Sequence, residues 1–105
     1  MAPDISTSSW FVYIICCSDG SYYTGATNNV EKRIKQHNAG RGAKYTRGRL
    51  PVELLRFFEL SSKSEALKFE YYIKKQNKKV KLSIIKQGEK NRYVKDYWSS
   101  RQYNG

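Results

Sequence analysis

Glu70 is a carboxylate at a position where the helical pattern favours an apolar side chain. The stretch EALKFEYYIKKQNKK, residues 65–79, has the spacing of an amphipathic helix. At roughly 100° per residue, its apolar arc includes Glu70 itself beside Ala66, Leu67, Phe69 and Ile73. Burying a carboxylate without a partner costs several kcal/mol. We therefore expect Glu70 to bind an ion or to pair with an arginine or another donor, and a salt bridge to Arg33 is the best purely structural explanation.

Two tyrosines, Tyr13 and Tyr23, are expected to face the same side of a β-hairpin. Three loop residues, 18–20, would pair Tyr23 with Ile15, and Gly25 with Tyr13. Gly25 then leaves open space beside the Tyr13 ring. A two-residue turn would place the tyrosines on opposite faces, so the length of the loop decides whether they can share a site.

Arg33 and His37 are four residues apart, so a helix places them on one face. The segment NNVEKRIKQHNAG predicts that helix, with Asn28 as its cap, Glu31 completing a capping box and Gly40 just past the end. An ordinary structural explanation is available for each side chain. Arg33 could be a solvated helix residue, and His37 could stabilise the C-terminal end of the helix dipole.

The hairpin comes from two adjacent apolar segments. WFVYIICC, residues 10–17, is typical of a strand buried on both faces, and SYYTGAT, residues 21–27, predicts the next strand. Between them Ser18, Asp19 and Gly20 form a common three-residue connection, with Gly20 in the left-handed region. The two-sided apolarity of the first strand predicts a central place in the sheet.

The remaining elements complete an α/β (α+β) sandwich. Residues 41–50 are a basic, glycine-containing segment without periodicity and predict a loop, and residues 51–60 have the composition of a third strand. Ser62 with Glu65 predicts a capping box at the start of the Glu70 helix, and residues 78–87 predict a further basic helix. We therefore expect a small, three-stranded, mainly antiparallel sheet flanked by about three helices.

Length and composition indicate one domain. The chain has 105 residues, of which 39% are hydrophobic, so we expect tails at 1–9 and 88–105 around a domain at 10–87. No apolar run is long enough to span a membrane, and the N-terminus lacks the features of a secretory signal. A cytoplasmic location is expected by default. The adjacent Cys16 and Cys17 are expected to be free thiols, since a disulfide between neighbours would be strained.

The net charge of +11 predicts a polyanionic partner. Residues 32–49 and 71–105 carry most of the lysines and arginines, while the rest of the chain is slightly acidic. A solvated basic surface would explain the same pattern. If the partner is nucleic acid, the residues expected to contact its phosphate backbone are Arg41, Lys44, Arg47, Arg49, Lys74, Lys75 and Lys78.

The order of these residues resembles the GIY-YIG nuclease superfamily. The matching positions are VYI at 12–14, YTG at 23–25, Arg33, His37 and Glu70. The arrangement is most similar to small single-domain members related to the nuclease domain of structure-selective endonucleases, and it covers residues 10–87. Val12 replaces the first glycine of the motif, and Thr24 replaces its isoleucine.

The resemblance implies a metal-dependent phosphodiesterase that cuts DNA, with a setting in repair or recombination. It implies that Glu70 holds one divalent cation, Mg²⁺ or Mn²⁺, that Tyr13 orients or deprotonates the attacking water and that Tyr23 assists at the phosphate. It also implies that Arg33 stabilises the scissile phosphate and that His37 is a helper or proton relay. The chemistry suits these residue types, because an arginine fork complements phosphate oxygens and Mg²⁺ needs only one or two carboxylates.

Two alternatives belong to other functional classes. The chain could be a noncatalytic nucleic-acid-binding module that retains the fold, or an accessory subunit that docks on a repair protein. Tyr13 and Tyr23 could then be packing aromatics of the sheet. A partner protein could also direct a catalytic domain of this size to its target. The oligomeric state is open at this point.

Overall fold

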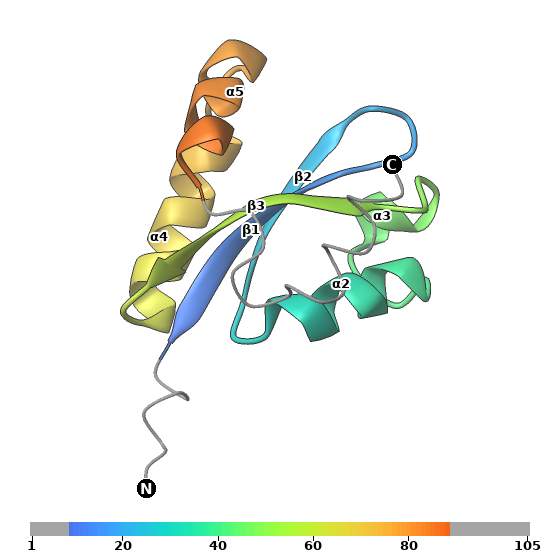
Figure 1. The fold of residues 1–105 in the computed structure, drawn as a ribbon, viewed down its shortest axis with the longest axis horizontal. Coiled ribbons are helices and arrows are strands. Elements are labelled where there is room, and N and C mark those ends of the chain that lie inside the picture. The colour runs from blue at the N-terminus through green and yellow to red at the C-terminus, as the bar shows by residue number, and fades with distance from the viewer. Residues whose placement is uncertain (1–8, 89–105) are drawn as a thin grey trace, which may run out of the picture.

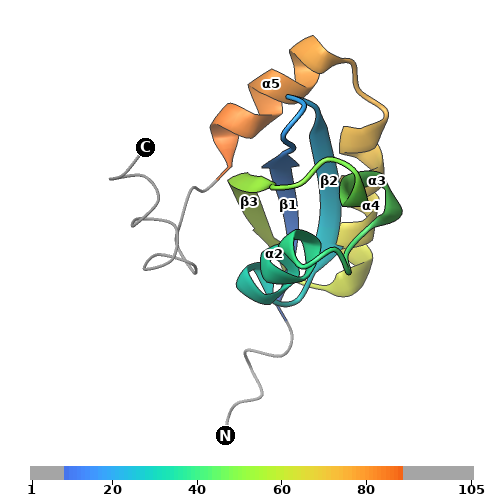
Figure 2. The same ribbon diagram turned by 90° about the vertical axis from the view of Figure 1, so that its right-hand side faces the viewer.

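The computed structural model describes residues 9–88, which form three strands and four helices. In chain order these are β1 (Trp10–Cys16), β2 (Tyr22–Thr27), α2 (Val30–Asn38), α3 (Lys44–Arg47), β3 (Glu53–Leu60), α4 (Lys63–Lys74) and α5 (Lys78–Gln87). The strands form an antiparallel sheet in the order β2-β1-β3. Helices α2 and α3 lie on one face of the sheet, and α4 and α5 lie on the other (Figure 1, Figure 2). The predicted three-stranded α+β fold is confirmed.

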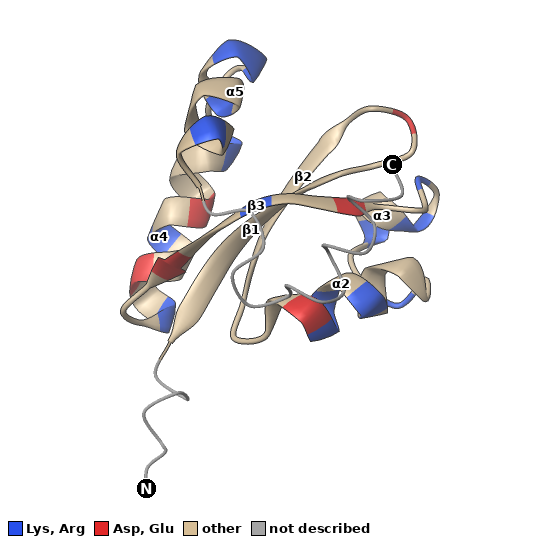
Figure 3. Ribbon diagram, viewed as in Figure 1, with Lys and Arg blue, Asp and Glu red and all other residues tan. Residues whose placement is uncertain are grey.

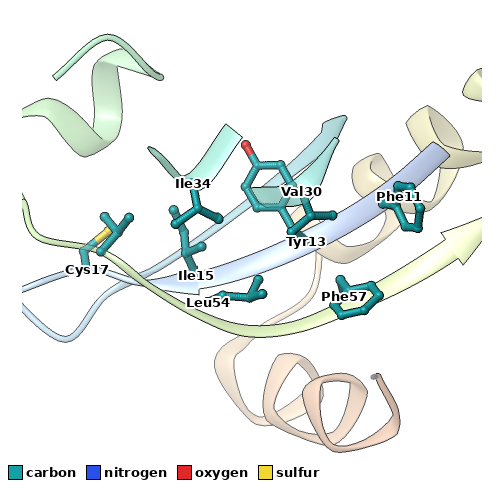
Figure 4. Close-up of a cluster of buried hydrophobic side chains, with 9 residues drawn as sticks. Phe11, Tyr13, Ile15, Cys17, Val30, Ile34, Leu54 and Phe57 are labelled. Atoms are coloured by element: carbon teal, nitrogen blue, oxygen red, sulfur yellow. The ribbon is translucent and has the colours of Figure 1, made fainter. Parts of the chain in front are cut away.

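The central strand β1 is buried on both faces because its side chains alternate between two cores. Phe11, Tyr13 and Ile15 belong to the cluster that includes Val30 and Ile34 of α2 (Figure 4). The intervening side chains join the cluster on the other face, which contains Val12, Ile14, Ala66, Ile73 and Ile85. Tyr13 therefore projects toward α2 and away from α4.

The predicted hairpin register is confirmed. Tyr13 pairs with Gly25 and Ile15 pairs with Tyr23, and Gly20 has a φ of 85° in the connecting loop. A Cβ atom at Gly25 would lie 2.5 Å from the Cζ atom of Tyr13, so the space that the glycine leaves is filled by the tyrosine ring. Gly25 thus allows the Tyr13 ring to lie across β2.

The prediction for α2 is wrong at the start of the helix and confirmed at its end. The N-cap is Asn29, not Asn28: the Asn29 side chain accepts a hydrogen bond of 3.0 Å from the backbone N–H of Lys32. The shift of one residue places Glu31 two positions after the cap, so the predicted capping box is wrong. Gly40 does follow the helix end with a φ of 79°.

The prediction of a loop for residues 41–50 is wrong in part, because this segment contains α3. A helix of one turn is too short to show a periodic pattern. In α4 the Ser62 cap is confirmed, since its side chain accepts from the Glu65 N–H at 3.1 Å. Leu67 is 46% exposed, however, so it does not belong to the buried arc of α4. The packing of α4 on the sheet centres on Ala66 and Ile73.

Several other predictions concern the limits of the domain. Cys16 and Cys17 are free thiols, as expected. No helix among residues 9–88 is long and apolar enough to cross a bilayer. The predicted tails, 1–9 and 88–105, lie outside the described residues except for the two positions that adjoin the domain.

Candidate active site

Tyr13 and His37 form a buried hydrogen-bonded pair between β1 and α2. The Tyr13 hydroxyl lies 2.8 Å from Nε2 of His37, and both side chains are almost completely inaccessible to solvent. The other ring nitrogen of His37, Nδ1, lies 2.9 Å from Oγ1 of Thr46 on α3. His37 does not act as a helix-end cation, because its ring is directed into the interior and bonded at both nitrogens.

Both groups of the pair are neutral at neutral pH. Burial raises the pKa of Tyr13 to about 12, with Arg33 acting in the opposite direction and Tyr23 and Glu70 adding to the rise. Burial and, to a smaller extent, the Arg33 charge lower the pKa of His37 to about 4. Arg33 lowers the pKa of Tyr13, but burial outweighs this effect.

Tyr23 completes an aromatic group around the pair. Its ring centroid lies 6.5 Å from that of Tyr13 and 5.5 Å from that of His37. On its outer side Tyr23 stacks on Tyr45 at 5.9 Å, and Tyr45 is 40% exposed. The aromatic group thus extends from the buried Tyr13 hydroxyl toward the surface along β2.

Arg33 lies beside this group on α2. Its Nη1 donates a hydrogen bond of 3.0 Å to Oε1 of Gln36. The Arg33 side chain also lines a hollow of about 280 Å³ between the end of β2 and the start of α2, with Lys32 and Gln36 on the same wall. The Arg33 guanidinium is a positive charge that lowers the pKa of both Tyr13 and His37.

Glu70 lies on α4, in the layer on the opposite face of the sheet from Tyr13 and His37. Its Oε2 lies 3.0 Å from Nζ of Lys74, and the Glu70 side chain is only 17% exposed. Lys74 Nζ in turn lies 5.3 Å from the centroid of the Tyr23 ring. Although α4 and Tyr13 are on different faces of the sheet, the Glu70 charge still raises the pKa of Tyr13. The expected salt-bridge partner, Arg33, is replaced by Lys74, which is one turn away on the same helix.

The residues expected to contact phosphate divide between the two layers (Figure 3). Arg41, Lys44 and Arg47 are exposed around α3, and Lys74, Lys75 and Lys78 are exposed on α4 and α5. Arg49 differs from these, because its Nε donates to Asp19 at 2.9 Å and its Nη1 donates to the Tyr45 carbonyl at 2.7 Å. Arg49 therefore anchors α3 to the hairpin loop as well as adding charge.

Comparisons with known proteins show the family to which the chain belongs. Residues 9–83 match a family described as the GIY-YIG catalytic domain. The chain belongs to the GIY-YIG family. This nuclease family is the one that the order of Tyr13, Tyr23, Arg33, His37 and Glu70 resembles.

Its GIY-YIG relatives include small proteins of similar length. A UPF0213 protein of Bacillus licheniformis is 48% identical over 99 residues, which cover 94% of this chain and all of that protein. A UPF0213 protein of Halobacterium salinarum is 56% identical over 74 residues, 70% of this chain and 96% of its own length. The solution NMR structure of a UPF0213 protein from Bacillus halodurans, 44% identical, superposes with a TM-score of 0.50 over 75% of this chain and 84% of that one.

Three residues around the Tyr13–His37 pair were not expected from the sequence. Tyr45 and Thr46 lie on α3, whose single turn shows no periodicity, so a buried threonine there could not be distinguished from the exposed residues around it. Gly42 lies against His37, since a Cβ at Gly42 would come 2.7 Å from Cγ of that ring. The sequence RGAKYTRG did contain one signal for these residues. Tyr45 and Thr46 interrupt an otherwise basic, glycine-containing segment.

Proposed function

We propose that this protein is a divalent-metal-dependent endonuclease that hydrolyses phosphodiester bonds in DNA. The observation that supports the proposal is the buried Tyr13–His37 hydrogen bond of 2.8 Å, with the Tyr23 ring packed beside it and the charges of Arg33 and Glu70 acting on the pKa of Tyr13. These groups come from four elements: Tyr13 from β1, Tyr23 from β2, Arg33 and His37 from α2, and Glu70 from α4. A buried proton-transfer pair, a fixed cation and a carboxylate are the groups that phosphodiester hydrolysis requires.

The charge distribution supports a nucleic-acid backbone that crosses the β2 edge. The two basic segments lie on opposite faces of the sheet, and β2 is the edge strand between them. Cations from both layers also lie over tyrosines near this edge: Lys78 is 5.4 Å from the Tyr22 ring, and Arg49 is 4.0 Å from the Tyr45 ring. A DNA strand in this position would contact lysines on one side and arginines on the other.

The proposed proton path runs through the Tyr13–His37 pair. Because Tyr13 is protonated and His37 is neutral at pH 7, Tyr13 can pass its proton to Nε2 while it accepts one from the attacking water. The water oxygen then forms a bond to phosphorus as the bond from phosphorus to the leaving oxygen breaks. The leaving oxygen takes a proton from solvent. The His37 imidazolium then returns its proton to solvent through Tyr13, which restores the starting state of the pair.

Arg33 and Tyr23 have supporting roles in the same proposal. Arg33 would hold the scissile phosphate, because its guanidinium fork would stabilise the charge that gathers on the nonbridging oxygens. Tyr23 would direct its hydroxyl toward the same phosphate from β2. Its ring also separates the buried pair from Lys74 at the surface.

The donor chemistry at Glu70 fits a hard divalent cation. Among residues 9–88 no three His, Cys, Asp or Glu side chains gather, so Glu70 would provide a single carboxylate, as Mg²⁺ or Mn²⁺ tolerates when waters complete its shell. The Lys74 ammonium at 3.0 Å shows that this carboxylate already attracts positive charge. When bound, such an ion supplies Lewis-acid stabilisation of the phosphate and of the leaving oxygen.

A setting in DNA repair or recombination belongs to the same proposal. It is supported by the resemblance to the nuclease domain of structure-selective endonucleases. In such a setting a partner protein would select the DNA structure to be cut, and the basic layers would supply affinity without sequence preference.

A cleavage assay with a matched pair of glutamate variants tests the proposal. The wild type, Glu70→Gln and Glu65→Gln are incubated with plasmid, single-stranded and branched DNA, with Mg²⁺, Mn²⁺ or a chelator. We expect metal-dependent cleavage by the wild type and by Glu65→Gln, whose altered side chain is exposed in the first turn of the same helix. Cleavage by Glu70→Gln should fall by at least about 100-fold.

The same assay separates the noncatalytic alternative. If the wild type binds DNA with a steep salt dependence but cuts none of the substrates, the protein is a binding module and the nuclease proposal is wrong. Equal cleavage by Glu70→Gln and the wild type would remove the carboxylate from the mechanism.

A further inference from the structure

Thr46 is a completely buried hydroxyl on an otherwise exposed basic turn. Its neighbours in α3, Lys44, Tyr45 and Arg47, are exposed, whereas Thr46 is 0% exposed. The Thr46 backbone N–H and its side-chain Oγ1 both lie within hydrogen-bond distance of the Ala43 carbonyl, at 3.1 and 2.9 Å. The hydroxyl is therefore fixed in position before it meets the His37 ring.

The number of available protons decides how Thr46 and His37 interact. A threonine hydroxyl has one hydrogen, and Thr46 donates it to the Ala43 carbonyl at 2.9 Å. The contact of 2.9 Å between Oγ1 and Nδ1 of His37 then requires Nδ1 to be the donor. Nε2 is left as an acceptor, and the hydroxyl of Tyr13 donates to it at 2.8 Å.

The opposite tautomer satisfies these groups less well. With the hydrogen on Nε2, the imidazole would donate to Tyr13, and within the described part of the chain the Tyr13 hydroxyl hydrogen would have no other acceptor. One contact favours this form, because the Ala43 N–H points at Nδ1. That contact is 3.4 Å long and so is weaker than the contacts of 2.8 and 2.9 Å that favour the first form.

We propose that Thr46 is a positioning residue that sets the tautomer of His37 with its hydrogen on Nδ1, so that Nε2 accepts the hydroxyl proton of Tyr13. Gly42 allows this arrangement, because any side chain there would overlap the His37 ring. Residues 42–46 thus position the histidine, in addition to any contact that their charged neighbours make with phosphate.

The consequence for catalysis rests on the proposed nuclease function. In the Nδ1–H form, Tyr13 has lone pairs free to accept a proton from water while its own proton goes to Nε2. In the Nε2–H form, that nitrogen is already protonated and cannot accept, so the path is closed. A change at Thr46 would therefore slow proton transfer without touching the DNA or the carboxylate of Glu70.

The test uses the fact that the chain contains one histidine. Long-range ¹H–¹⁵N correlation spectra of the ¹⁵N-labelled full-length protein at neutral pH report which ring nitrogen carries the hydrogen. We expect Nδ1–H in the wild type and in Thr46→Ser, which retains a hydroxyl. In Thr46→Val, which has nearly the same shape and no hydroxyl, we expect a shift to Nε2–H.

Two results would overturn the proposal. The first is the Nε2–H form in the wild type, a result that does not depend on any variant folding. The second is an unchanged Nδ1–H form in folded Thr46→Val. In the cleavage assay, Thr46→Val should lose roughly tenfold or more in rate at unchanged DNA affinity, and Thr46→Ser should recover most of it. If the wild type cuts no DNA, the nuclease proposal fails, while the tautomer measurement still decides the role of Thr46.

Discussion

The two layers that meet at the β2 edge are built by different physical means. On the α2–α3 side, His37 and Thr46 are fully buried, and each polar atom of the histidine ring has a partner within 2.9 Å. On the α4–α5 side, Glu70 remains partly accessible, and its partner Lys74 is 45% exposed. Groups that transfer a proton need fixed geometry, whereas groups that bind ions and phosphate must exchange water and partners.

The contrast predicts that substitutions in the buried Tyr13–His37–Thr46 network change proton transfer or stability, while substitutions at Glu70 and Lys74 act through ion binding. It also explains why a charged group beside a tyrosine has a strong electrostatic effect in one layer and a weak one in the other. Arg33 shifts the pKa values of a buried pair, whereas Lys75 lies 4.9 Å from the exposed Tyr71 ring, where solvent screens its charge.

Arg33 should give the largest effect among the supporting residues. Replacement by methionine removes a donor fork beside the proposed phosphate position, and we expect the cleavage rate to fall by about 100-fold or more. Arg33→Lys should recover only a small part, because an ammonium cannot make the paired hydrogen bonds. Single-turnover rates at saturating DNA measure this effect.

The control for Arg33 is a cation removed from the same helix. Lys35→Met deletes a charge whose side chain is 63% exposed and which pairs with Glu31 at 3.6 Å. Its cleavage rate should stay within about twofold of the wild type. Equal losses for Arg33→Met and Lys35→Met would mean that α2 contributes only general positive charge.

The buried histidine predicts a pH dependence of stability that the lysine-rich layer does not share. His37 titrates at about 4 in the folded protein, below its ordinary 6.5. Between these values the unfolded chain binds a proton that the folded protein does not, so the free energy of unfolding falls as the pH falls. The loss should approach about 3 kcal/mol by about pH 4.

Urea unfolding at about pH 7 and about pH 4.5 measures this dependence. His37→Gln lacks the titrating group, so its stability should change much less over the same interval. Carboxylates contribute equally to both proteins, and the comparison isolates the histidine. Parallel curves for the two proteins would show that the imidazole is not held neutral by burial.

Lys74 should give the smallest effect. In the free protein the Lys74 ammonium pairs with the Glu70 carboxylate and so competes with a metal ion for it. Lys74→Met should therefore strengthen Mg²⁺ or Mn²⁺ binding by roughly two- to fivefold, the range expected for breaking a partly exposed ion pair. Titration calorimetry without DNA measures the affinity. Lys68→Met, an exposed lysine on the same helix, should leave it nearly unchanged, and equal gains in both variants would indicate a general charge effect.

The elements that could be predicted from the sequence are those with a repeated local signal. Alternating burial along β1, the three-residue loop and the spacing of Tyr13 and Gly25 define the hairpin, because side-chain direction in a strand follows from register. The inward position of Glu70 was also predictable, because it interrupts the apolar pattern of α4. The site roles assigned from the motif remain proposals.

The features that could not be predicted depend on tertiary contacts. The Glu70–Lys74 pair is an exception, because the two residues are four apart on one helix and their spacing could have predicted the contact. Thr46 gains its role only when α3 folds back on α2. Burial likewise decides the direction of the Tyr13 pKa shift, because desolvation depends on how closely α2 and Gly25 cover the ring.

The most direct test of the account measures rate and affinity together for Tyr13→Phe. This change removes one hydroxyl from the buried pair, and Tyr71→Phe removes one from an exposed ring on α4 as a control. Single-turnover cleavage and DNA binding are measured for both, with thermal unfolding to confirm that they fold. We predict that Tyr13→Phe binds DNA like the wild type and cuts it at least about 100-fold more slowly, while Tyr71→Phe cuts at the normal rate. Cleavage by folded Tyr13→Phe at the wild-type rate would contradict the account.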